Sequence, residues 1–308
     1  MTEPTLWEQV IDLFKSWFVY QNVSVLQVLA GLGLALGFGA VWLAAHWPPL
    51  FKRPSFWLIA VVSAFLTMLA VVFVQYPIQY WYDRFLLHFW DLTAIDDWLL
   101  LAGIPAVLVS GLVQEGAKMA PMAVFWLKHG RRITPAMGLA IGAVAGAAFG
   151  VFEAFWVAER ILGAGWTVAA FGDGFFGIAG FWERFFAVGF HTAVSAMIGY
   201  GLARGQGWQY YLVGSAFHAL FNYGRFFLQK GYFSLVQLET VVAVIAVLLS
   251  AVVLIVRWRI TRDFPGEGAY DPDRYVDYSE LGLDEPPEEE NAAQPDAAAE
   301  KPGEEKTD

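Results

Sequence analysis

The 308-residue chain contains no cysteine. Disulfide bonds, thiol nucleophiles, iron–sulfur clusters and zinc sites built from thiolates are therefore excluded. Charged side chains are also scarce, because they make up 16% of the residues against about 25% in soluble domains. This composition is not that of an ordinary soluble enzyme. The sequence also has no concentrated basic region of the kind that binds nucleic acid.

What is present is mainly apolar. Hydrophobic residues make up 57% of the chain and aromatic residues 17%. Most of the acidity belongs to one end, since residues 263–308 contain 16 of the 29 acidic residues and 3 of the 19 basic ones. The remaining chain has a formal net charge of +3. The sequence therefore predicts an apolar, slightly basic body with an acidic extension.

Three regions follow from this distribution. Residues 1–22 place Trp7, Phe14 and other apolar residues at helical spacing among charged ones, which predicts an amphipathic helix at the membrane interface. Residues 23–257 are expected to form the transmembrane helical domain. Residues 258–308, rich in Pro, Glu, Asp and Ala, are expected to be a disordered cytoplasmic tail, because they contain too little apolar surface to fold.

The central region contains apolar segments long enough to cross a bilayer, which requires roughly 20 residues each. We therefore expect an all-α, polytopic membrane protein with about seven transmembrane helices. The segments are Val23–Ala45, Ser55–Val74, Pro105–Leu127, Thr134–Ala158, Arg184–Leu202, Trp208–Leu228 and Ser234–Val256.

The loops between these segments predict the orientation. Nine Lys and Arg residues fall on the side that includes the C-terminal end, and five fall on the opposite side. Because basic loops stay in the cytoplasm, the C-terminal tail is expected there, in the membrane of a bacterial cell. The aromatic-rich segment Tyr76–Trp90 is expected to lie along an interface, where Trp and Tyr collect.

A stripe of glycines follows one face of the fourth segment. Gly138, Gly142, Gly146 and Gly150 repeat every four residues. Small residues at this spacing let helices approach closely in lipid. We expect this stripe to serve packing and to bring polar side chains of neighbouring helices within reach of one another.

Ionisable groups inside apolar segments are costly, at roughly 2.5–3.5 kcal/mol each on insertion scales, and usually serve a function. Glu115 and Lys118 share one helical face, as do His218 and Asn222. Counting from the expected helix ends places Glu115, Glu153, His191 and His218 between the midplane and the outer surface. The residues singled out as candidates for one polar site are Gln114, Glu115, Lys118, Glu153, His191, His218 and Asn222.

Two hydrolytic mechanisms fit this set. In the first, Glu115 held by Lys118 acts as general base on water, and His218 and Asn222 stabilise an oxyanion. In the second, Glu153, His191 and His218 ligate a catalytic zinc ion with a fourth position open for water. The residue types leave both mechanisms open.

The same residues carry a family resemblance. The segment Gln114–Lys118 resembles the E-E-x-x-K motif of the PrsW family of intramembrane proteases, and Phe149–Glu153 resembles its F-x-x-x-E pattern. His191 is similar to its next histidine. The segment His218–Asn222 resembles its last motif, H-x-x-x-D/N, which the superfamily of CAAX proteases and bacteriocin-processing proteins shares. In the first motif, Gln114 stands where the family has a glutamate.

The resemblance implies a membrane-bound endopeptidase that cleaves membrane-anchored proteins, such as anti-sigma factors, near the extracytoplasmic side. It implies Glu115 as the water-activating carboxylate, with Glu153, His191 and His218 completing the site and Asn222 supporting it. The alternative is a non-enzymatic membrane protein. That protein would be either a catalytically silent relative that binds membrane helices or a transporter with a proton-titrating Glu/His cluster.

Overall fold

The computed structural model describes residues 4–263 and residue 270. Every element in this part of the chain is helical, and no strand occurs in it. The elements are α1 (Leu6–Ser16), α2 (Val25–His46), α3 (Pro54–Ala70), the π-helix η1 (Val71–Gln75), α4 (Tyr76–Phe89), α5 (Leu92–Asp97), α6 (Leu99–Lys128), α7 (Pro135–Gly163), the 3₁₀ helix η2 (Val168–Asp173), α8 (Phe175–Ala203), α9 (Gly207–Gln229) and α10 (Leu235–Asp263). The expected all-α, polytopic architecture is confirmed.

Six helical stretches are long and apolar enough to cross a membrane, namely α2, the run Pro54–Phe89, α6, α7, α8 and α10. The seventh expected segment forms α9, which has 23 residues but is less apolar than the other six. Gln209, His218, Asn222 and Arg225 lower its hydropathy. Helix α9 packs against α6 and α8 within the bundle. His218 is buried there, whereas Arg225 is exposed.

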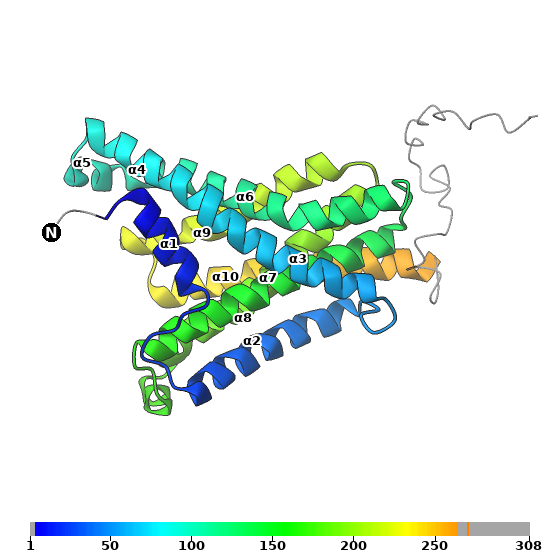
Figure 1. The fold of residues 1–308 in the computed structure, drawn as a ribbon, viewed down its shortest axis with the longest axis horizontal. Helices are drawn as coiled ribbons and strands as arrows, with labels where there is room; N and C mark the ends of the chain where they lie inside the picture. Colours follow the sequence, from blue (N-terminus) through cyan, green and yellow to red (C-terminus); the bar gives the residue numbers. More distant parts are fainter. Residues whose placement is uncertain (1–3, 264–269, 271–308) are drawn as a thin grey trace, which may run out of the picture. The chain divides into compact units, whose positions relative to one another are not determined.

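The segment Tyr76–Phe89 differs from the expectation of an interfacial helix, because it continues the helix that begins at Pro54 (Figure 1). The continuation depends on the π-helical turn Val71–Gln75. Pro77 has no N–H and its ring crowds the carbonyl four residues earlier, and a wider turn accommodates this locally. The turn also displaces Gln75 from the regular helical register, with the consequence described below.

The pair α7 and α8 forms the centre of the bundle, and both helices are more buried than the other candidate spans. The glycine stripe explains how closely they pack. A Cβ atom at Gly138, Gly142 or Gly146 would overlap the backbone carbonyl of Gly199, Ser195 or His191, respectively. The predicted packing role of the stripe is confirmed, since α8 backbone occupies the space that side chains would need.

The observed helix lies within the expected region at the N-terminal end, and another extends past the expected boundary at the C-terminal end. Helix α1 lies inside the expected region 1–22 and begins with a capping box formed by Thr5 and Glu8. At the other end, α10 extends to Asp263, so this helix continues past the expected boundary at residue 257. The remainder of the predicted tail lies outside the described residues, apart from Tyr270.

Candidate functional site

The centre of the candidate site is the carboxylate of Glu115 on α6. The Lys118 ammonium, one helical turn later, donates to Glu115 Oε1 at 2.6 Å. His218 Nδ1 on α9 donates to the same oxygen at 2.6 Å. Glu115 and Lys118 have no exposed surface, and His218 is 2% exposed. Glu115 Oε2 has no hydrogen-bond partner among the described residues, so it remains available to accept a hydrogen.

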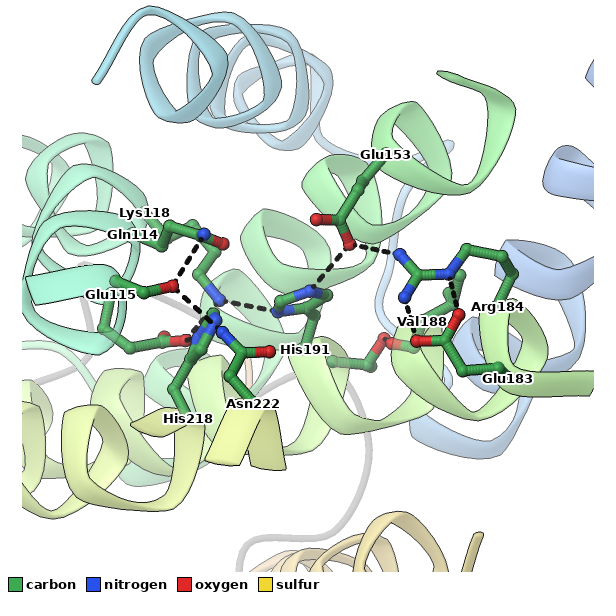
Figure 2. A network of polar contacts seen from close by, with 12 residues as sticks. Gln114, Glu115, Lys118, Glu153, Glu183, Arg184, Val188, His191, His218 and Asn222 are labelled. Carbon is green, nitrogen blue, oxygen red and sulfur yellow. Dashed lines mark hydrogen bonds and ion pairs between the residues drawn. The ribbon is translucent and has the colours of Figure 1, made fainter. Parts of the chain in front are cut away.

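A second branch extends from Lys118 to α8 (Figure 2). Lys118 Nζ lies 3.0 Å from Nδ1 of His191. A lysine ammonium carries only donors, so this ring nitrogen accepts and the hydrogen of the neutral ring is on Nε2. That nitrogen points to Glu153 Oε2 on α7 at 3.3 Å. Lys118 therefore sets the tautomer of His191 and links Glu115 to Glu153.

The branch ends at Arg184, which the sequence places at the start of an expected apolar segment and not among the candidate site residues. Arg184 Nη1 donates to Glu153 Oε2 at 2.8 Å, and its guanidinium also pairs with Glu183. Arg184 has 13% of its side chain exposed and Glu153 has 20%. The network thus runs from Glu115 to Glu183 (Figure 2). Its groups are fully buried at Glu115 and partly accessible at Glu153 and Glu183.

A second polar cluster, made of side-chain amides and one hydroxyl group, lies near Glu115. Ser110 Oγ accepts from Gln114 Nε2 at 3.2 Å and from Asn222 Nδ2 at 2.9 Å. Gln114 Nε2 also donates to Gln75 Oε1 at 3.0 Å. The π-helical turn η1 supplies Gln75, which sequence reasoning missed. A glutamine within an apolar run, two residues before a proline, was the available signal.

Close backbone approach assembles these groups. At Gly146 the carbonyl of His191 occupies the space a Cβ would need, and at Gly111 the carbonyl of Ser215 does the same. The first contact fixes the distance of α7 from α8 beside His191. The second fixes the distance of α6 from α9 beside His218. The glycines thereby hold the helices that carry the polar groups.

The structure brings together most of the predicted site residues. Glu115, Lys118, His191, His218 and Glu153 form one connected network. Asn222 and Gln114 instead meet at Ser110 in a second, neighbouring cluster. Glu115, His191 and His218 lie near the midpoints of their helices, and Glu153 lies nearer the end of α7 that precedes η2. The expected meeting of separate helices at one buried polar site is therefore what the structure shows.

The residues that could hold a metal ion in the structure differ from the expected donor set. The group whose potential ligand atoms all lie within 4.8 Å of one another consists of Glu115, His191 and His218. Glu153 lies against His191 but is not part of this group. Two imidazoles and a carboxylate are a donor set that zinc accepts. However, Lys118 Nζ already bridges Glu115 Oε1 and His191 Nδ1, so a metal ion using both atoms has to displace a buried ammonium.

Comparisons of this chain with models of protein families, with curated proteins and with solved structures found no match. The geometry of the site therefore carries the functional conclusion.

Proposed function

We propose that this protein is an intramembrane endopeptidase that hydrolyses peptide bonds of membrane-anchored proteins, with Glu115 as the general base. The observation that carries the proposal is the arrangement around this carboxylate. Oε1 receives two hydrogen bonds from side chains on α6 and α9, while Oε2 has no partner among the described residues. A carboxylate fixed through one oxygen can take a proton from water through the other.

In the proposed reaction, Glu115 both removes a proton from water and returns it to the leaving group. Glu115 Oε2 takes a proton from water as the water oxygen bonds to the carbonyl carbon of the substrate. The tetrahedral intermediate then breaks at its C–N bond, and Glu115 returns the proton to the leaving amine nitrogen. Lys118 keeps the carboxylate ionised in an apolar surrounding, because a nearby opposite charge favours the charged form.

The hydrogen-bond directions divide the supporting roles. His218 uses its Nδ1–H on Glu115, so its neutral ring has no second hydrogen for an oxyanion. The amide of Asn222 donates one hydrogen to Ser110 and keeps a second one. We therefore assign oxyanion stabilisation to Asn222 and orientation of Glu115 to His218. His191 and Glu153 orient Lys118 from the opposite side.

The resemblance to the PrsW family agrees with this proposal, since its motifs fall on the residues of the network. The substrates proposed are single-span proteins, including anti-sigma-factor-like ones, cleaved in the outer half of the bilayer. Zinc remains the alternative chemistry. If present, it would be held by Glu115, His191 and His218, and it would supply a Lewis acid and a more acidic bound water.

The test is cleavage of a single-span substrate in proteoliposomes. The variants Glu115→Gln, Glu153→Gln and His218→Ala should lose cleavage, with Glu115→Gln falling by about 10²–10⁴-fold, the range of general acid–base catalysis. Glu8→Gln is the matched control, because glutamine also completes a capping box. Wild-type rates in all three site variants would refute the proposed site. Inhibition by a membrane-permeant chelator that zinc reverses would select the metal mechanism.

A second candidate function is favoured by the continuity of the network from Glu115 to Glu183. Chains of ionisable groups inside membranes also serve proton-coupled transport. Proton uptake into proteoliposomes that depends on Glu115, without peptide cleavage, would support this transporter. A protein with neither activity that still binds membrane helices would be a catalytically silent relative.

A further inference from the structure

One hollow on the described surface lies away from the polar network. It is a groove of about 1020 Å³ between α2 and α3, with a stretch of α7 as its floor. The two helices diverge from the loop that joins them (Figure 1). The floor is formed by Val144, Ala147, Ala148 and Val151. Its surface is therefore apolar and nearly smooth.

The length of the groove discriminates between possible occupants. Its wall on α2 extends from Leu36 to Trp47, which corresponds to about 16 Å along a helix axis. The hydrocarbon core of a bilayer is about 30 Å thick. The groove thus covers one leaflet, and it ends at the loop Pro48–Arg53, which also lines it. A transmembrane helix would have to continue past this loop, whereas the acyl chains of one lipid need not.

The charge at the mouth of the groove selects the headgroup. Lys52 and Arg53 line the groove at its loop end. Arg257 on α10 donates to the hydroxyl of Tyr270 at 3.2 Å, and Tyr270 lines the groove as well. Two cationic side chains therefore line the end where a headgroup would lie, and a third, Arg257, is joined to it through Tyr270. Basic pockets between transmembrane helices on the cytoplasmic side are suited to anionic lipid headgroups.

The aromatic residues at the mouth agree with an interfacial position. Trp47 and Trp57 line the groove, and 73% and 50% of their surfaces are exposed. Tryptophan collects at the depth of lipid headgroups. The loop end of the groove therefore matches the level where a phosphate lies, and the apolar part extends towards the midplane.

We propose that this groove is a binding site for one anionic phospholipid, with its phosphate at Lys52 and Arg53 and its acyl chains along α2 and α7. The proposal is independent of the hydrolytic activity. It concerns the face of α7 between α2 and α3, whereas the polar network connects α7 to α8.

The test is native mass spectrometry of the detergent-purified protein titrated with phosphatidylglycerol and with phosphatidylcholine of the same acyl chains. Phosphatidylglycerol should bind more tightly. The double variant Lys52→Gln/Arg53→Gln should weaken its binding by about 30-fold, as expected for two basic residues near a lipid phosphate. Lys128→Gln/Arg259→Gln is the matched control, because it removes two exposed charges outside the groove.

A second pair of variants tests the apolar part. Ala40→Trp fills the groove and should abolish binding of phosphatidylglycerol, whereas Val41→Trp, on an exposed neighbouring position outside the groove, should not. Size-exclusion chromatography establishes that each variant is folded, and Ala44→Leu replaces Ala40→Trp if the latter is not. Equal binding of the two lipids, unchanged binding in both groove variants, or equally tight binding of glycerol phosphate alone would overturn the proposal.

Discussion

At the scale of single residues, the decisive feature is an ion pair that is fully shielded from solvent. Glu115 and Lys118 are both fully buried, and each has a further partner in a histidine. Removing one member of a buried pair leaves an uncompensated charge, whereas replacing both members by apolar groups is often tolerated. The pair is therefore a vulnerable point for stability as well as the proposed centre of reactivity.

This asymmetry gives a prediction for Lys118. The variant Lys118→Met should lower the free energy of unfolding by about 3–5 kcal/mol, because Glu115 loses its counter-charge. The double variant Glu115→Gln/Lys118→Met should regain a large part of this loss. The measurement is a double-mutant cycle from denaturant unfolding in detergent. Strictly additive effects would show that the two side chains are not coupled.

At the scale of secondary-structure elements, glycine positions determine where helices meet. The centre of the molecule depends on backbone contact between α7 and α8, and α2 offers a comparison within the same protein. Gly33 has no atom within 4 Å of the position a Cβ would take, whereas that position at Gly146 overlaps the carbonyl of His191. Both glycines lie inside apolar helices, but a side chain has room at Gly33 and has none at Gly146.

Substitution by alanine should separate these two positions. Gly146→Ala should destabilise the protein by about 1–3 kcal/mol through overpacking and should reduce activity, since His191 is displaced with α8. Gly33→Ala should be neutral or stabilising by up to about 1 kcal/mol, because alanine is the better helix former. Thermal unfolding of both variants in one detergent is the comparison. Equal stability would argue against close packing at Gly146.

Helix α1 provides a pH-dependent prediction outside the membrane-spanning segments. The backbone N–H of Thr5 donates to the Glu8 carboxylate at 2.7 Å, and this lowers the pKa of Glu8 below its ordinary value of 4.5. A carboxyl group with a lowered pKa stabilises the folded state above the unfolded pKa and loses this effect as the pH falls through the folded pKa. The start of α1 should therefore loosen below about pH 4.5.

Hydrogen–deuterium exchange, corrected for the intrinsic pH dependence of exchange, measures this effect. Protection of Glu8 and the following amides should decrease at low pH in the wild type. It should stay constant in Glu8→Gln, in which the capping side chain does not titrate. A pH dependence that persists in this variant would assign the change to another group.

At the scale of the whole molecule, the helix directions determine the topology. The C-terminal ends of α2, α6, α8 and α10 lie together in Figure 1, at the end that carries most of the basic loop residues. Because cytoplasmic loops are enriched in Lys and Arg, we expect this end of the transmembrane domain in the cytoplasm. The segment that contains η2 is then expected on the opposite side.

The absence of cysteine makes this topology directly measurable. Single cysteines introduced by Lys128→Cys and Asp173→Cys lie at exposed positions on opposite ends of the helices. A membrane-impermeant maleimide should label Asp173→Cys in intact cells and should label Lys128→Cys only after the cells are opened. The reverse pattern would invert the orientation and place the proposed lipid groove in the outer leaflet.

One part of the polar network could be predicted from the sequence, and another part could not. Glu115, Lys118, His191 and His218 were predictable as one site, because each is an ionisable residue at mid-span and ionisable residues in spans usually face a shared interior. Gln75 and Arg184 were not. Gln75 reaches Gln114 only through a π-helical turn, and Arg184 reads as a charge at a helix end until its ion pair with Glu153 is seen.

The sequence by itself determined the class of protein, because long apolar runs have few alternatives to spanning a membrane as helices and the scarce polar residues within them mark its interior. Only the tertiary structure decided which polar atoms meet. It joined Glu115, rather than Glu153, to both histidines as a possible donor set, and it placed Lys118 between Glu115 and His191. The physical reason is that helix rotation and close approach depend on packing between distant segments, which local spacing does not specify.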